Sequence, residues 1–341
     1  MSAPEPSTRT SPAQMPIVLR ALGYFAVFVP YIVLTRWFAT VPFAPLGRPL
    51  SGLEILPAVT ILSGICTYLF VWRYGWTREA HRIRIGGREW PRPTRWTALS
   101  GIGVALLLIT VPLSFTFKGA SIPFMQLLMR GDLLIVAPAV DLFSGRRVRW
   151  YSWIALLLVA SGLAVTIHAR GGLRLPTLAI VVVALYTVGY FIRLWVMTRV
   201  AKSGNTRSVQ GYFVEEQIVA IPVALAALAA LSLADFGEQH GQLAFGFVGV
   251  WQAGLLGRLV VLAALLFLIS ILAILILLDK RENSFCVPFE RSASVLAGVA
   301  AAAILGAMSF GPYPSAVELT GAGLLVAAIV LLAIAPNRSA A

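Results

Sequence analysis

The residues of this chain that could do chemistry are charged side chains inside long apolar segments. Arg130 and Asp132 lie in one such segment, and Glu290 and Arg291 lie in another. An isolated charge near the bilayer centre costs about 3 kcal/mol on insertion scales, so each group needs a partner or contact with water. Asp132 lies about 200° round a helix from Arg130 and cannot pair with it directly. If the two segments meet, Glu290 is the expected partner of Arg130, and Arg291 that of the aspartate.

Two roles stay open for these four charges. They could form a salt-bridge network that pins two parts of the protein together, or they could contact a substrate in a polar cavity. Both roles hold if the network breaks and re-forms during transport. Four further side chains are candidates for lining such a cavity: Tyr31, Gln126, Tyr186 and Tyr190. Aromatic residues packed between helices belong more often to the core, so a packing role for the tyrosines also stays open.

Two adjacent carboxylates begin a further apolar segment. Glu215 and Glu216 could form an interfacial pair that neutralises Lys202 and Arg207. They could instead bind a coupling proton or cation, since a buried carboxylate can titrate near neutral pH. Arg193 lies near the end of the preceding segment, and we expect its long side chain to extend to the membrane surface.

Composition places these charges in a membrane protein. The chain has 341 residues, 59% hydrophobic and 12% charged, with a mean hydropathy of +0.85, whereas a soluble domain is about a quarter charged. The uncharged run 259–278 alone is long enough to cross a bilayer core. Apolar segments predict ten transmembrane helices, at 17–36, 53–72, 97–117, 121–141, 151–168, 177–199, 211–233, 255–278, 284–306 and 316–335.

The basic residues predict the orientation of these helices. The loop between the second and third segments holds seven arginines: Arg73, Arg78, Arg82, Arg84, Arg88, Arg92 and Arg95. Loops on the same side hold most of the other basic residues, so the positive-inside rule puts both termini in the cytoplasm. Residues 1–16 and 336–341 are then short cytoplasmic tails, the first of them disordered. The net charge of +13 is explained by loops beside anionic lipid, and nucleic-acid binding is not expected.

One landmark occurs twice in the chain. Arg130 precedes Gly162 by 32 residues, and Arg291 precedes Gly323 by the same 32 residues. Each pair brackets an apolar span that contains the arginine, a short polar loop and a second apolar span. Ten spans divide into halves 17–170 and 171–335, and five spans per half require that the halves insert in opposite orientations. Such an inverted repeat puts its binding site near the bilayer midplane between the halves.

The segments SIPFMQLLMRGDLLIVAPAVDLFSGRRVRWYSWIALLLVASGLAV (121–165) and VPFERSASVLAGVAAAAILGAMSFGPYPSAVELTGAGLLVAAIVLLA (287–333) resemble the repeat ends of EamA-like proteins of the drug/metabolite transporter superfamily. The resemblance implies ten helices in two inverted five-helix repeats, around a central cavity lined mainly by the first, third, fourth, sixth, eighth and ninth. It also implies export or exchange of small polar metabolites. Family members often have Gly-Glu after the fourth helix, where this chain has Gly145-Arg146.

No motif indicates an enzyme or a cofactor. The lysines do not follow glycine as in a phosphate-binding loop, and no H-E-x-x-H zinc motif occurs. Cys66 and Cys286 fall inside predicted helices, so neither a disulfide nor a metal site is expected.

The sequence therefore favours a secondary transporter, an exporter or exchanger of a small polar or anionic metabolite, in a bacterial inner membrane. Its expected partners are the small-molecule substrate and membrane lipid, and a homodimer is an open possibility. Two other functions stay open: a translocase for a lipid or lipid-linked precursor on the same fold, and a non-transporting membrane scaffold or assembly factor whose central charges are fully self-paired.

Overall fold

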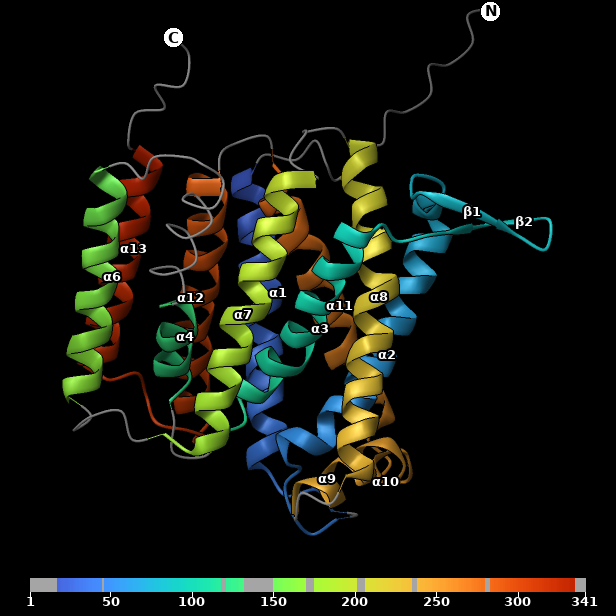
Figure 1. Ribbon diagram of the computed structural model, residues 1–341. Coiled ribbons are helices and arrows are strands. Elements are labelled where there is room, and N and C mark those ends of the chain that lie inside the picture. The colour runs from blue at the N-terminus through green and yellow to red at the C-terminus, as the bar shows by residue number, and fades with distance from the viewer. Residues whose placement is uncertain are drawn as a thin grey trace, which may run out of the picture.

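The computed structural model describes residues 17–44, 46–117, 121–131, 150–169, 175–200, 206–234, 238–279 and 283–334. They form a bundle of long helices with one small hairpin (Figure 1). The longer helices are α1 (Ile17–Thr40), α2 (Gly52–Arg73), α3 (Arg95–Ser114), α6 (Trp150–Ala169), α7 (Thr177–Val200), α8 (Thr206–Leu233), α11 (Leu256–Leu277), α12 (Asn283–Ala307) and α13 (Ala316–Ile334). The shorter elements are η2 (Trp76–Arg78), β1 (Arg82–Ile85), β2 (Arg88–Pro91), α4 (Ile122–Arg130), α9 (Glu238–Phe247) and α10 (Gly249–Gln252).

The helices confirm an all-α, multi-pass membrane protein. Seven helices of the described residues are long and apolar enough to cross a membrane. The helices α6 and α13 contain shorter apolar stretches, Leu157–Ala169 and Ala316–Ala328. The helix α4 begins where expected, but residues 132–141 of the predicted span 121–141, Asp132 among them, lie outside the described residues, as do the tails 1–16 and 336–341.

The ends of the chain's described part lie on one side of the bundle. The start of α1, the end of α13 and the hairpin β1–β2 lie toward one end of the helices, which we call the terminal face (Figure 1). The helices α9 and α10 lie toward the other end, which we call the opposite face. An even number of membrane crossings produces this arrangement.

Several helix contacts occur in matching pairs. The helix α3 packs against α7 and α8, and α11 packs against α1 and α2. In addition, α4 packs against α12, and α6 against α13. The contact of α3 with α7 matches that of α11 with α1, and the contact of α3 with α8 matches that of α11 with α2. In this comparison α1, α2, α3, α4 and α6 correspond in order to α7, α8, α11, α12 and α13.

Close packing of α3 between its neighbours depends on glycine. A Cβ atom placed on Gly103 of α3 would lie 2.7 Å from the carbonyl oxygen of Gly189 of α7, and the reverse distance is the same. A Cβ on Gly101 would lie 2.8 Å from the carbonyl oxygen of Glu216 on α8. Small residues of this kind let membrane helices approach backbone to backbone, and here they allow α3 to pack closely on both α7 and α8.

Candidate functional site

Buried polar residues from four helices meet inside the bundle. This central cluster consists of Tyr24 on α1, Arg130 on α4, Tyr186 and Tyr190 on α7, and Glu290 and Arg291 on α12. No member is more than 4% exposed. A charge buried to this degree is stable only when other groups replace the water it has lost.

Two arginines converge on one tyrosine. Arg130 and Arg291 each donate a hydrogen bond from Nη1 to the hydroxyl oxygen of Tyr186. The guanidinium of Arg291 lies 3.6 Å from the centre of the Tyr190 ring, and that of Arg130 lies 5.5 Å from the centre of the Tyr186 ring. The rings stack, with centres 6.1 Å apart, because residues four positions apart share a helix face. A desolvated cation–π contact contributes about 2 kcal/mol, so the aromatic pair holds two positive groups together.

The carboxylate of Glu290 is held from two sides. Its Oε1 accepts a hydrogen bond of 2.8 Å from the hydroxyl of Tyr24, and its Oε2 lies 3.6 Å from Nε of Arg291. The expected ion pair between Glu290 and Arg130 is not formed, although both residues are described. The helix α1 packs on α12 instead and brings the Tyr24 hydroxyl to the carboxylate. The other expected acid, Asp132, lies outside the described residues.

Gln126 places an amide beside this cluster. It lies four residues before Arg130, hence on the same face of α4, and it is 1% exposed. Neither its amide nitrogen nor its amide oxygen has a hydrogen-bond partner among the described residues. A Cβ on Gly298 would lie 2.8 Å from its Cγ, so α12 closes over it. A buried amide with both groups unsatisfied is unusual in proteins and calls for a water or a ligand.

Tyr31 lies outside the central cluster. It is buried in an aromatic group with Phe28, at a ring distance of 6.0 Å, and Phe115, at 6.2 Å. Its hydroxyl has no hydrogen-bond partner among the described residues. The sequence left open whether Tyr31 lines a cavity or packs in the core, and this aromatic environment favours packing.

A second buried group lies where α7, α3 and α8 meet. Glu216 is fully buried and accepts two hydrogen bonds from Arg193, 3.2 Å from Nε and 3.0 Å from Nη2. Ser100 of α3 donates a third, of 2.7 Å, and lies 2.6 Å from the hydroxyl of Tyr212. The expected extension of Arg193 to the membrane surface is therefore wrong: its side chain is 8% exposed, because the close packing of α3 brings Glu216 within its reach.

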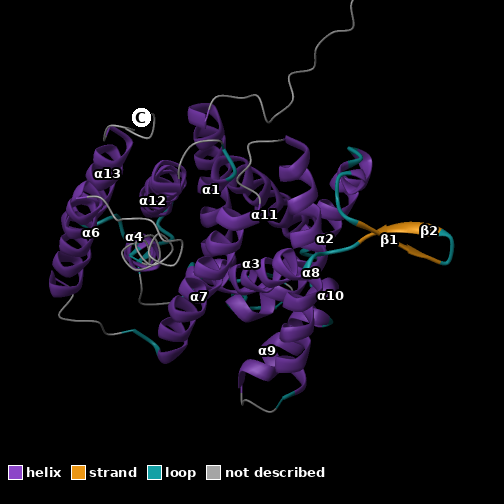
Figure 2. Cartoon of the chain, turned by 45° about the horizontal axis from the view of Figure 1, so that its top comes forward, coloured by secondary structure: helices purple, strands orange, loops and turns teal. Residues whose placement is uncertain are grey.

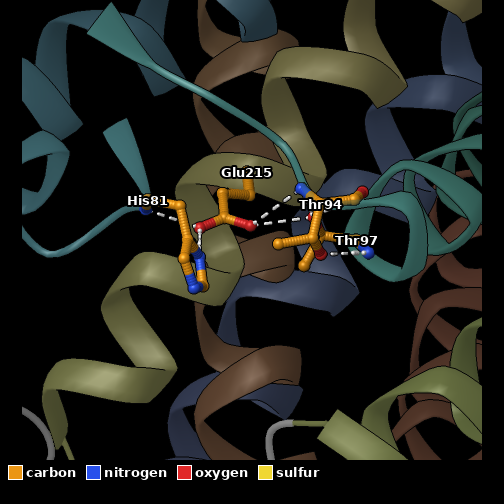
Figure 3. Close-up of polar contacts among 4 residues, drawn as sticks. All are labelled: His81, Thr94, Thr97 and Glu215. Atoms are coloured by element: carbon orange, nitrogen blue, oxygen red, sulfur yellow. Dashed lines mark hydrogen bonds and ion pairs between the residues drawn. The ribbon is translucent and has the colours of Figure 1, made fainter. Parts of the chain in front are cut away.

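Glu215 binds the loop that precedes α3 (Figure 3). Its Oε1 accepts from the backbone N–H of His81 at 2.8 Å and lies 2.7 Å from the ring Nδ1 of the same residue. Its Oε2 accepts from the hydroxyl of Thr97 at 2.8 Å and from the backbone N–H of Thr94 at 3.3 Å. Because Thr94 caps α3, this carboxylate fixes the start of α3 and the base of the hairpin to α8. The proposed neutralisation of Lys202 and Arg207 concerns side chains outside those described.

A cavity and an ion pair lie toward different faces of the bundle. Toward the opposite face, a cavity of about 440 Å³ lies between the ends of α1 and α3, the starts of α2 and α7, and α9; its lining includes Ala39, Leu113, Thr116, Leu178 and Gln242. Toward the terminal face, α1 and α11 are joined by Arg20, which lies 3.1 Å from Asp279 and donates a 2.6 Å hydrogen bond to the carbonyl oxygen of Leu275.

Tyr24 of the central cluster, and Ser100 and Tyr212 beside Glu216, were not predicted as site residues. Tyr24 lies seven residues before Tyr31, so helical periodicity puts both on one face of α1 and could have indicated it. Ser100 and Tyr212 give no such signal, because their role depends on how α3 and α8 are rotated.

The fold and the buried charges define a multi-pass helical membrane protein with an ionic interior. Among known proteins, no family model and no curated protein matches the chain. A solved structure described only as "Crystal structure of protein" is similar over 92% of this chain and 95% of that one, with 15% sequence identity and a TM-score of 0.49. A similarity of this size identifies neither a family nor a function.

Proposed function

We propose that the protein is a secondary transporter that moves a small polar or anionic metabolite by alternating access between two inverted five-helix halves. One observation carries the proposal: Arg130 and Arg291, equivalent positions of the two halves, both bond the hydroxyl of Tyr186. Residues related by a twofold axis can contact the same atom only when that atom lies near the axis. The hydroxyl of Tyr186 therefore marks the meeting point of the halves.

The helix contacts support the repeat. Exchanging the helices of one half for those of the other converts the contacts of α3 with α7 and α8 into those of α11 with α1 and α2. We infer that α4, α6 and α13 complete a set of ten spanning helices. Five helices per half then require opposite insertion, with the twofold axis in the membrane plane and the site near its middle. The basic loop on the terminal face supports a cytoplasmic position for that face, and we infer a bacterial inner membrane.

The chemistry of the cluster favours an anionic solute. A guanidinium binds carboxylate or phosphate through two parallel hydrogen bonds, and two such groups point at one oxygen position here. The amide of Gln126, one turn from Arg130, offers a donor and an acceptor to a second polar group of the solute. We infer a substrate that carries a carboxylate or phosphate together with a hydroxyl, amide or amine.

The difference between the faces supports alternating access. In the proposed repeat, the contact of α1 with α11 on the terminal face corresponds to that of α7 with α3 on the opposite face. The contact of α1 with α11 is closed by the ion pair of Arg20 and Asp279. At the contact of α7 with α3, the cavity is lined by Leu178 and Leu113. Leu178 lies eight residues from Tyr186, about 12 Å along α7. We infer a conformation open toward the opposite face and closed toward the terminal face.

Ten helices in two inverted repeats around a central site are what the sequence's resemblance to the drug/metabolite transporter superfamily implies, and we propose membership on that basis. A lipid translocase or a membrane scaffold on the same fold would use the central charges differently. The experiment below separates the three.

The test is a thermal-stability screen of the detergent-purified protein against soluble metabolites and lipid head groups. A ligand at one hundred times its Kd stabilises the folded state by about 2.7 kcal/mol. We expect soluble anions to raise the melting temperature of the native chain, and Arg291→Gln to abolish the effect. Arg36→Gln is the matched control, because Arg36 is a half-buried arginine that bonds only the carbonyl oxygens of Phe115 and Phe117 among the described residues.

Proteoliposomes then test transport. Uptake or exchange of the stabilising solute, lost with Arg291→Gln and kept with Arg36→Gln, would support the proposal. Stabilisation by lipid head groups alone would favour the translocase instead. If no compound stabilises the protein, and the Arg291 variant unfolds at the same temperature as the control variant, the central charges are not a binding site and the proposal is wrong.

A further inference from the structure

The hairpin β1–β2 stands apart from the helix bundle. Figures 1 and 2 show it projecting sideways from the terminal end of the bundle, across the direction of the helices. Within the described residues, the only element that either strand contacts extensively is the other strand. An isolated two-stranded hairpin is at best marginally stable in water, so this hairpin needs a surface to lie on.

The two faces of the hairpin differ in chemistry. Ile83 pairs directly with Trp90 across the strands, so both side chains lie on one face, where they are 36% and 54% exposed. On the other face, the carboxylate of Glu89 forms hydrogen-bonded ion pairs with Arg82, 2.7 Å from its Nη1, and with Arg84, 3.4 Å from its Nε. These hydrogen bonds lower the pKa of Glu89, so its carboxylate is ionised at neutral pH. The hairpin therefore has one apolar face and one charged face.

Aromatic side chains mark the level of the hairpin in the membrane. Trp72 and Tyr74, at the end of α2 just before the hairpin, are 75% and 66% exposed. Exposed tryptophan and tyrosine at helix ends are typical of the boundary between hydrocarbon and head groups. The base of the hairpin is tied to α8 at the same level by the bonds between His81 and Glu215 (Figure 3). The hairpin thus extends sideways at the depth of the lipid head groups.

We propose that this hairpin is a membrane-surface anchor that inserts its Ile83–Trp90 face among the head groups of the surrounding leaflet and binds anionic phospholipid through its arginines. The segment 73–95 carries seven arginines against two glutamates. Arg88 lies on the same face as Trp90 by strand alternation, where a long side chain reaches from an apolar surface to a phosphate. A basic segment beside a membrane is attracted to anionic lipid, and an amphipathic segment with aromatic residues buries its apolar face about 5–10 Å into the boundary.

The test measures the depth of each face in the full-length protein. Cysteines are introduced as Ile83→Cys and, on the opposite face, Arg84→Cys, in a background with Cys66→Ser and Cys286→Ser. A polarity-sensitive fluorophore is attached to each, and the protein is placed in nanodiscs of phosphatidylcholine with or without phosphatidylglycerol. Quenching is measured with aqueous iodide and with lipid nitroxides near the head group or near the chain end. Trp90→Cys is a second variant of the apolar face, in case the first does not fold.

With phosphatidylglycerol, the label at position 83 or 90 is expected to emit at shorter wavelength and to be quenched best by the shallow nitroxide. The label at position 84 is expected to be quenched by iodide. High salt or phosphatidylcholine alone should reduce the lipid quenching at position 83. Iodide access at positions 83 and 90 in both lipids would overturn the proposal. Shielding from both quenchers would overturn it too, since a protein would then cover the face, and quenching unaffected by lipid charge would refute the anionic preference.

Discussion

The buried pair of Arg193 and Glu216 gives the sharpest test of how this bundle is held together. Glu216→Gln removes the charge that accepts two hydrogen bonds from Arg193 and one from Ser100. The arginine, with a side chain 8% exposed, then remains buried beside a neutral amide. Breaking one partner of a buried pair costs about 3–5 kcal/mol, whereas replacing both by apolar residues is often neutral. We therefore expect Glu216→Gln to destabilise the protein by about 3 kcal/mol.

The matched control is Glu89→Gln on β2. Glu89 also pairs with an arginine, Arg82, at 2.7 Å, but the side chains of the arginine and the glutamate are 39% and 40% exposed. An exposed pair contributes little to stability, so this variant should unfold close to the native protein. Unfolding is followed in mixed micelles by circular dichroism as denaturing detergent is added. If Glu216→Gln and Glu89→Gln unfold together, the inner pair does not stabilise the contact of α3 with α7 and α8.

A double variant of Arg193 and Glu216 distinguishes a structural role of this pair from a role in coupling the proposed transport to an ion gradient. Arg193→Met combined with Glu216→Leu should restore stability, because both buried charges are removed together. If the double variant is stable and still binds the substrate but no longer couples its transport to a proton or cation gradient, Glu216 is a coupling carboxylate. A stable variant with intact coupling would assign the pair to packing alone.

Two further perturbations follow from the geometry. Gly103→Ala should destabilise the protein by about 1–3 kcal/mol through overpacking, because the new Cβ would lie 2.7 Å from the carbonyl oxygen of Gly189; detergent unfolding measures this. Asp279→Asn should loosen the terminal face by removing the carboxylate from Arg20, and should increase maleimide labelling of the buried Cys286 in the folded protein.

Each of these has its own control. Gly257→Ala on α11 meets no atom within 4 Å and should leave stability unchanged; equal effects of the two alanines would contradict the close packing of α3. The labelling experiment uses Cys66→Ser as background. Unchanged labelling of Cys286 after Asp279→Asn would show that the ion pair does not close the terminal face.

Length and hydropathy were sufficient to predict where the longer helices lie, although the short helices α9 and α10 were not predicted. Each predicted apolar segment overlaps a described helix, because a helix is the arrangement that satisfies its own backbone within hydrocarbon. The rotation of each helix about its axis was not predictable, since a membrane helix that is apolar all round has no hydrophobic stripe to orient it. The partner of Glu290 was wrongly predicted for this reason, and the burial of Arg193 depends on glycines whose contacts lie on other helices.

The hairpin was missed although its signal is present in the chain. Gly86 and Gly87 have φ values of 58° and 78°, the two successive positive values that a tight hairpin turn requires and that glycine supplies most readily. Isoleucine and arginine alternate before this pair of glycines. The segment was interpreted from its arginines alone, which indicate a cytoplasmic loop. Its two strands are only four residues long, so their alternation is a weak signal beside the charge.

The tyrosine shared by Arg130 and Arg291 has a consequence for the energetics of the proposed transport cycle. In the proposed repeat, segment 184–199 (ALYTVGYFIRLWVMTR) aligns with segment 21–36 (ALGYFAVFVPYIVLTR), so Tyr186 corresponds to Gly23. Only one half then contributes the phenol on which both arginines meet, and exchanging the roles of the halves does not regenerate the same set of contacts. If the proposed cycle holds, the conformations open to the two sides differ in free energy, and a solute on the axis meets chemically different walls. A transporter of this kind would have an intrinsic resting side and would bind its solute in one preferred orientation.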